Sequence, residues 1–311
     1  MKIALVGECM FENRADCAPV EKNKIYFGGD TVNTAVYLSR LLKGRDAEVY
    51  YITRIGDSPR DDGLINALAD EAINCSLTEQ VKGGITGNYT IHVDPDGERS
   101  FTYDRAQAPA RELFSNSACF LLDRIAHFDV LYVSGITLAI LSQYARQRLL
   151  QLMNDMKADG KMVVYDSNHR PLLWENEKNA RDTHIAAFQA CTVALPSYED
   201  LQLIFCENSK DYFFERFRKM EISQIVLKDG DKGVMLLTDG EIRDISLQKV
   251  TAPKDTTGAG DSFNAGFLSV ILSGGGISDA VMSGHRLAAK VIMHFGAIIP
   301  QAAMVNNDRS N

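Results

Sequence analysis

The clearest chemical signal in this chain is a short glycine-containing segment in its last quarter. It reads Asp255-Thr256-Thr257-Gly258-Ala259-Gly260-Asp261-Ser262-Phe263, and apolar residues then recur at helical spacing. The pattern predicts a bare backbone turn that opens into a helix over 260–272. Unpaired amides and the positive dipole end at such an N-terminus attract anions such as phosphate. Asp261, in the first turn, is then placed to take a proton from a hydroxyl that attacks the phosphate.

The same segment has a simpler interpretation, because Asp is also a common N-cap of an ordinary core helix. A second segment, Gly28-Gly29-Asp30-Thr31-Val32-Asn33, raises the same question near the start of the chain. Its glycines permit close approach of a ligand. Asp30 and Asn33 share one helix face, where a carboxylate and an amide can bind vicinal hydroxyls. Alone, this segment fits a glycine-rich loop before an N-cap equally well.

Two further polar segments follow predicted strands. Asp166-Ser167-Asn168-His169-Arg170-Pro171 comes after a strand expected at 162–165. In open parallel sheets the ligand crevice lies beyond the carboxyl ends of the strands, so these side chains are in the right neighbourhood. Lys228-Asp229-Gly230-Asp231-Lys232-Gly233 follows a strand expected at 224–227. That turn either passes beside a nucleotide or is a plain hairpin turn into 234–237.

The elements that must position these segments alternate between apolar strands and longer helical patterns. Such alternation is typical of βαβ units and a largely parallel sheet. No linker or repeat interrupts it, so we expect a single domain over 1–311. The expected strands are 3–6, 49–52, 130–133, 162–165, 192–195 and 224–227, and the expected helices are 31–42, 60–70, 142–158, 198–205, 211–219, 260–272 and 278–294.

Residues 11–28 and 86–105 depart from this alternation. The first stretch is polar and irregular, whereas the second predicts an antiparallel hairpin around Asp94-Pro95-Asp96-Gly97. This register places Tyr89 opposite Tyr103 and gathers the odd-numbered residues on one face. An isolated hairpin is unstable in water, so it must cover something. The face either packs on the core or, because it ends in two phenols and the guanidinium of Arg105, grips a polar ligand as a lid.

Composition excludes several classes of function. A net charge of −8 and the absence of a Lys/Arg block argue against nucleic-acid binding, and no apolar run is long enough to cross a membrane. The N-terminal apolar run ends at Glu8, too early for a signal peptide. Six scattered cysteines indicate a reducing cytoplasm rather than a disulfide framework. An acidic protein repels anionic ligands, so such a substrate would need locally placed arginines.

Taken together, Gly-Gly-Asp-x-x-Asn, Lys-x-Gly-x-x-Gly and Asp-Thr-Thr-Gly-Ala-Gly-Asp-Ser-Phe resemble, in this order, the signatures of the PfkB-type (ribokinase-like) carbohydrate kinases. The resemblance covers essentially the whole chain. It implies an α/β fold: a ribokinase-like three-layer sandwich with a mainly parallel central sheet flanked by helices. It also implies a small β-sheet lid formed by about 11–28 and 86–105.

Within that family the chain looks most like the 2-keto-3-deoxygluconate kinases. The likeness rests on segments such as Gly97–Arg105, Asn168–Trp174 and Gly296–Pro300. It implies ATP-dependent phosphorylation of 2-keto-3-deoxygluconate to 2-keto-3-deoxy-6-phosphogluconate, with Mg²⁺ and with or without a monovalent cation. The resemblance makes Asp261 the general base and the turn of Gly258, Ala259 and Gly260 the anion hole. Because a carboxylate is best held by arginine, Arg105 and Arg170 are expected to bind the acid group.

The resemblance also assigns the remaining site residues. The sugar acid is expected at Gly28, Gly29, Asp30, Asn33, Tyr89, Tyr103, Arg105, Asn168, Arg170 and Asp261. The nucleotide is expected at Lys228, Gly230, Gly233, Thr257, Gly258, Gly260 and His285. No direct protein ligand to the metal is expected. Where many relatives have Asn-x-x-Glu this chain reads Ser197-Tyr198-Glu199-Asp200, so Glu199 or Asp200 would act through water.

Two alternatives stay open at the level of sequence. One is a kinase of a neutral sugar such as fructose or ribose, and the other is a sugar-acid-binding regulator that has lost turnover. The intact Asp261 and its glycine turn favour an enzyme. A nicotinamide enzyme is disfavoured because the first strand leads into Gly7-Glu8-Cys9-Met10 rather than G-x-G-x-x-G. A lid with an apolar face predicts a homo-oligomer, either a dimer or a dimer of dimers.

Overall fold

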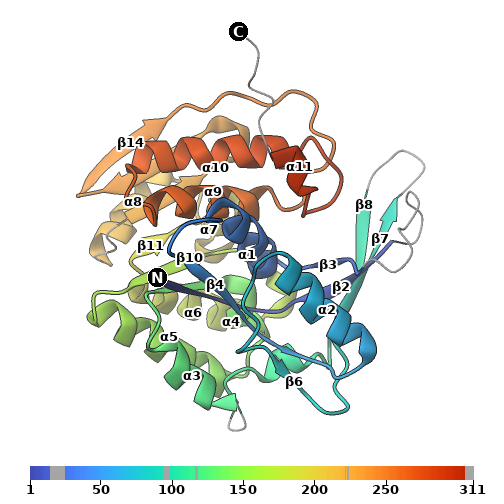
Figure 1. Cartoon of the computed structure of the whole chain (residues 1–311). Coiled ribbons are helices and arrows are strands. Elements are labelled where there is room, and N and C mark those ends of the chain that lie inside the picture. The colour runs from blue at the N-terminus through green and yellow to red at the C-terminus, as the bar shows by residue number, and fades with distance from the viewer. Residues whose placement is uncertain (15–24, 94–98, 116–117, 221, 223, 305–311) are drawn as a thin grey trace.

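An eight-stranded, mainly parallel sheet forms the centre of the computed structural model, which describes residues 1–14, 25–93, 99–115, 118–220, 222 and 224–304 (Figure 1). The strand order is β14-β13-β12-β11-β10-β9-β1-β4, and β13 alone runs against the others, since it pairs antiparallel with both β12 and β14. The strands are β1 (Lys2–Val6), β4 (Glu48–Ile52), β9 (Val130–Ser134), β10 (Met162–Asp166), β11 (Val193–Ala194), β12 (Gln224–Lys228), β13 (Val234–Thr238) and β14 (Glu241–Ile245). All six predicted strands are confirmed within one or two residues.

Two apolar layers, one on each face of this sheet, follow from alternation along the strands. In β1, Ile3 and Leu5 join one buried cluster, whereas Ala4 and Val6 join the other. Residues of the following helices join the first cluster: α1 (Asp30–Leu41), α2 (Pro59–Asp70), α9 (Ala259–Ile271) and α10 (Ile277–Val291). The short α11 (Gln301–Met304) packs against it. The second contains α3 (Phe120–Ile125), α4 (Gly135–Ile140), α5 (Gln143–Ala158), α6 (Glu177–Ala190), α7 (Tyr198–Phe205) and α8 (Lys210–Lys219).

A smaller sheet projects from one side of the molecule (Figure 1). Its order is β3-β2-β7-β8, with β2 (Met10–Arg14), β3 (Phe27–Gly28), β7 (Asn88–Val93) and β8 (Arg99–Asp104). The predicted hairpin pairing of Tyr89 with Tyr103 is confirmed, and its turn at 94–97 lies outside the described residues. The expectation of irregular structure over 11–28 is wrong at both ends, because β2 pairs with β7 and with β3. A separate two-stranded sheet joins β5 (Arg54–Ile55) and β6 (Glu79–Gln80).

The apolar face of the hairpin is divided between core and solvent. Tyr89 and Ile91 are buried in a small cluster with Met10, and Phe101 packs against it. Tyr103, at the end of the same face, is 54 % exposed. The inner strand β7 therefore buries its side of this face, whereas the edge strand β8 presents the ring of Tyr103 to solvent. In the part of the chain that the structure describes, no helix is long and apolar enough to cross a membrane.

Candidate active site

The glycine turn before α9 depends on Gly258. This residue caps the helix in the left-handed conformation, with φ at 75°. A Cβ atom added there would lie 2.9 Å from the carbonyl oxygen of Ala297 and 3.0 Å from its Cα. The Ala297 carbonyl is held in place by the buried hydroxyl of Tyr37, which donates to it at 2.6 Å. Gly258 is therefore required both by its backbone angle and by the close approach of another loop.

Asp255 ties the two sides of this turn together. One of its carboxylate oxygens accepts from the Thr257 amide at 3.0 Å and from the Thr257 hydroxyl at 2.7 Å. The other accepts from the amide of Gly296 at 2.7 Å. The sequence motif contains Asp255, but sequence reasoning assigned it no role. It is a buried positioning residue, and it already holds the Thr257 hydroxyl that was predicted to meet the nucleotide.

The first amides of α9 differ in what they can bind. The N–H of Ala259 donates to the carbonyl of Thr256 at 3.2 Å. Within the described residues the N–H groups of Gly260 and Asp261 have no partner, as expected for the first turn of a helix. If Gly260 carried a Cβ atom, the nearest atom to it would be the ammonium nitrogen of Lys228, at 3.9 Å. The turn thus offers two amides, open space and a nearby cation, which suits a phosphoryl group.

The two sequence signatures meet at Asp261. Its carboxylate accepts from the side-chain amide of Asn33 at 2.8 Å, and Thr34 donates to its backbone carbonyl at 3.3 Å. Asp30, at the start of α1, accepts from the side-chain amide of Asn168 at 2.8 Å. Burial, followed by the charge of Asp30, raises the pKa of Asp261 well above its usual range. A carboxylate with a raised pKa accepts a proton more readily near neutral pH, as a general base requires.

A polar network around Lys228 lies next to this centre. The Lys228 ammonium donates to the side-chain amide oxygen of Asn264 at 3.0 Å and to a carboxylate oxygen of Asp166 at 3.3 Å. The amide of Asn264 donates to the other Asp166 oxygen at 2.8 Å and to the Tyr132 hydroxyl at 2.9 Å. Sequence reasoning missed Asn264 and Tyr132. Asn264 could have been found, because it is a polar residue at a position of the predicted helix expected to be buried, one turn after Asp261.

The paired glycines near the N-terminus are required by close packing against other parts of the protein. A Cβ at Gly28 would collide with the Tyr89 hydroxyl, and one at Gly29 with the backbone carbonyl of Glu8. Protein atoms therefore fill the space that a side chain would need at either position, and close approach of a ligand to this backbone stays a prediction. The Tyr89 hydroxyl is itself buried and donates to Glu12 at 2.7 Å. Of the two predicted lid tyrosines, Tyr103 is the accessible one.

The two predicted arginines have different surroundings. Arg105, just after β8, is nearly buried and forms an ion pair with Glu8, which follows β1. Arg170 is exposed and donates to the backbone carbonyl of the adjacent His169 at 2.8 Å. Sequence reasoning overlooked Glu8 as a functional group, although an acidic residue directly after a buried first strand was visible. A carboxylate is thus already present at the arginine that was expected to receive one.

The remaining residues predicted for the nucleotide are spread over several elements. Gly230 begins a short 3₁₀ turn, Gly230–Lys232. Gly233 has φ at 107°, and an added Cβ would lie 2.7 Å from the Ile245 carbonyl, so it shapes the β13–β14 hairpin. His285 is half-buried on α10, where burial lowers its pKa. It follows Gly284, whose backbone packs against Phe263 of α9.

The two acidic residues considered for the metal differ in exposure. Glu199 is exposed, whereas Asp200 is buried and accepts from the Ser167 hydroxyl at 2.6 Å. Burial raises the pKa of Asp200. Across the described ranges no three His, Cys, Asp or Glu side chains come together to hold a metal ion. Mg²⁺ commonly keeps several waters and binds substrate phosphates, so it needs no such cluster of protein ligands.

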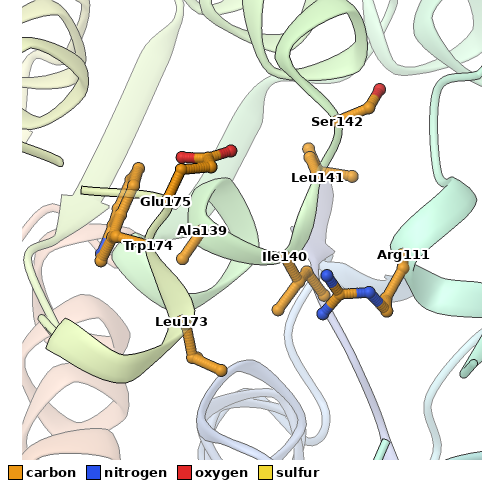
Figure 2. Close-up of a pocket in the computed structure, with 8 residues that line it drawn as sticks. All are labelled: Arg111, Ala139, Ile140, Leu141, Ser142, Leu173, Trp174 and Glu175. Atoms are coloured by element: carbon orange, nitrogen blue, oxygen red, sulfur yellow. The ribbon is translucent and has the colours of Figure 1, made fainter. Parts of the chain in front are cut away.

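A cavity of about 370 Å³ lies beside α4 and contains none of the predicted site residues (Figure 2). The Arg111 guanidinium extends toward Ile140 in this view, and Trp174 and Glu175 form the opposite part of the lining. Arg111 connects the cavity with the site, because its positive charge lowers the pKa of Glu8. Through Arg111, the lining of this cavity therefore acts electrostatically on Glu8.

Comparisons with known proteins place this geometry in context. A family model described as "pfkB family carbohydrate kinase" matches residues 1–304. A 2-dehydro-3-deoxygluconokinase of Escherichia coli K12 is 36% identical over 307 residues, which covers 97% of this chain and 98% of that protein. A fructokinase of Vibrio alginolyticus is 27% identical over 247 residues, with 78% and 76% coverage.

The solved structure of a 2-dehydro-3-deoxygluconokinase from Thermotoga maritima matches with a TM-score of 0.80. It is 18% identical and covers 96% of this chain and 94% of that one. At this identity the match shows the fold alone. The expected ribokinase-like arrangement of a large, mainly parallel sheet flanked by helices, with a smaller separate sheet, is confirmed.

Proposed function

The chain belongs to the PfkB family of carbohydrate kinases and is a sugar kinase, and from this premise we propose that its substrates are ATP and 2-dehydro-3-deoxygluconate, the compound also called 2-keto-3-deoxygluconate. The product is the 6-phosphate ester. The observation that carries the proposal is the meeting of both signatures at one point, where Asn33 binds Asp261 and Asn168 binds Asp30. The identity of 36% to a kinase of this substrate over nearly the full length supports the choice of sugar.

In the proposed reaction the chain supplies a base, an anion-binding turn and a cation. Asp261 takes the proton of the primary hydroxyl as that oxygen attacks the γ-phosphorus of ATP, and the bond from this phosphorus to the β,γ-bridging oxygen breaks to release ADP. The amides of Gly260 and Asp261 and the ammonium of Lys228 stabilise the charge on the phosphoryl group that is transferred. Phosphoryl transfer asks a protein mainly for alignment and charge stabilisation, which these groups provide. Magnesium would neutralise phosphate charge at the same turn, and Asp200 is the buried carboxylate available to bind its water.

The acid group of the sugar is assigned to Arg105 and Arg170. Both follow strands that end near the predicted sugar site, and the protein is otherwise acidic, so local positive charge is needed. The small sheet, whose edge strand β8 carries the exposed Tyr103, would act as the lid that closes over the sugar and excludes water. A kinase of a neutral sugar is the second candidate, because fructokinases also match this chain at lower identity.

A coupled assay of ADP release with purified protein, ATP and a panel of sugars tests the proposed function. We expect kcat/KM for 2-keto-3-deoxygluconate to exceed that for fructose and ribose by at least about 10²-fold, since a site built to bind a charged group rejects ligands that lack it. A preference for fructose or ribose would instead make the protein a neutral-sugar kinase. Binding of the sugar acid without ADP release would indicate a regulator.

Replacing Arg170 by alanine tests the carboxylate assignment. We expect kcat/KM for the sugar acid to fall about tenfold or more, because a hydrogen bond to a charged group contributes about 1.5–3 kcal/mol. Turnover of a neutral sugar should change by less than about twofold, within the effect of an ordinary surface substitution. Arg286→Ala, which removes an exposed arginine from α10, is the matched control. Equal losses for acidic and neutral sugars would contradict the assignment.

A further inference from the structure

Glu8 is a buried carboxylate at the carboxyl end of β1 that no step of the proposed reaction uses. Only 2 % of its side chain is exposed, and its partner Arg105 is 11 % exposed. Gly87 lies directly against it, since a Cβ added at Gly87 would be 3.1 Å from Glu8 Oε1. The carboxylate is therefore enclosed by protein and cannot simply turn outward to water.

The contact between Glu8 and Arg105 is a charge contact with unsatisfied atoms. Oε2 of Glu8 meets Nη2 of Arg105 in the ion pair, whereas Oε1 of Glu8 and Nε of Arg105 make no hydrogen bond within the described residues. Buried polar atoms in this condition are rare and costly in free energy. The guanidinium thus keeps hydrogen-bonding capacity for another group of suitable shape, which a ligand carboxylate provides.

The charges around Glu8 determine what happens when such a ligand arrives. They come from the elements packed against it: Arg105 after β8, Arg111 in the 3₁₀ turn Pro109–Glu112, and Asp30 at the start of α1. The nearby Cys9 and Tyr51 are neutral, because burial raises the pKa of each. A ligand carboxylate would add one more negative charge beside Glu8 and Asp30. Carboxylates so close together in a poorly solvated site do not all stay ionised.

We propose that Glu8 is a specificity-determining residue that takes up one proton when the carboxylate of an acidic sugar binds Arg105. The inference rests on the proposed function, since it requires an acidic substrate. In the proton balance, the buffer supplies a proton to a Glu8 oxygen, the Glu8–Arg105 ion pair is lost, and an ion pair between Arg105 and the ligand carboxylate forms. A neutral sugar adds no charge and leaves the original pair intact.

The titration of Glu8 agrees with this geometry. Burial raises its pKa to about 7, with Arg105 and Arg111 limiting the rise and Asp30 adding to it. With a pKa of about 7, about nine-tenths of Glu8 is ionised at pH 8 and about one-tenth at pH 6 in the ligand-free protein. A ligand carboxylate raises that pKa further. Binding of the acid is therefore expected to weaken as pH rises from 6 to 8.

Calorimetric titration of the full-length protein with 2-keto-3-deoxygluconate, in two buffers of different ionisation enthalpy, counts the protons. We expect uptake of about 0.9 proton per ligand at pH 8 and about 0.1 at pH 6. Over the same range KM for the sugar acid should rise about tenfold. In Glu8→Gln both effects should vanish, with uptake below about 0.2 proton and KM changing less than about twofold.

Glu79→Gln is the matched control, because Glu79 also pairs with a buried arginine, Arg54, and is not among the residues predicted to bind the sugar. It should retain the proton uptake of the unmodified protein. If the unmodified protein binds the sugar acid at pH 8 without proton uptake, the inference is overturned, even if Glu8→Gln fails to fold. Uptake that persists in Glu8→Gln would overturn it too. Normal turnover of the sugar acid would still stand in both cases, whereas absence of both turnover and binding would overturn the proposed function and this inference with it.

Discussion

Replacing Asp261 by asparagine is expected to lower kcat by about 10²–10⁴, the range typical of general-base catalysis, while the Kd for ATP stays within about twofold. Asparagine keeps the size of the side chain and its contact with Asn33 but cannot accept the proton of the attacking hydroxyl. The amides of the α9 turn and Lys228 remain, so the phosphate-binding part of the site is preserved. Steady-state kinetics and nucleotide titration measure the two quantities separately.

The pH profile gives this prediction a second readout. The pKa of Asp261 is raised, and a base works only when unprotonated, so kcat should fall as pH decreases through that raised pKa. The acidic limb should disappear in the asparagine variant. Asp279→Asn, which alters an exposed aspartate in the first turn of α10, is the matched control and should leave kcat and its pH profile unchanged. A near-normal kcat in Asp261→Asn would exclude Asp261 as the base.

Replacing Gly258 by alanine is expected to reduce kcat about 10²-fold, because displacement of a catalytic turn by about 1 Å can cost that much. The added methyl group would meet the backbone of Ala297 at 2.9–3.0 Å. That backbone cannot yield easily, since Tyr37 bonds to the carbonyl of Ala297 and to the amide of Ile299. The turn must therefore move, and the amides of Gly260 and Asp261 move with it.

Gly160→Ala separates this steric effect from backbone strain. Gly160 has the same φ of 75°, but no atom lies within 4 Å of an added Cβ. Both variants should lose about 1–2 kcal/mol of stability from the left-handed backbone, measurable by thermal or denaturant unfolding. Only Gly258→Ala should lose activity. Equal kcat values for the two variants would show that the turn tolerates the side chain, and would remove the steric argument for Gly258.

How far the sequence predicted the fold depended on the strength of each local pattern. The buried strands and most long helices were predicted within a few residues, because runs such as Val130-Leu131-Tyr132-Val133 are hydrophobic throughout. The helix Glu177–Ala190 was missed, since Phe188 is the one large apolar residue on its buried face and the others are alanines, Thr183 and His184, which give little periodic signal. The strand Met10–Arg14 was missed because its pairing with β7 joins segments far apart in the chain.

By itself the sequence determined which residue types stand at the candidate site and which fold carries them. Glycines at 258 and 260, the aspartate at 261 and the second signature at 28–33 are local patterns, and local patterns are readable without coordinates. Only the tertiary structure decided which of these groups are free and which are already bound. Arg105 is paired with Glu8, the Tyr89 hydroxyl with Glu12, and the Thr257 hydroxyl with Asp255. The physical reason is that two of these three partners come from distant segments, and burial determines how strongly each pair interacts.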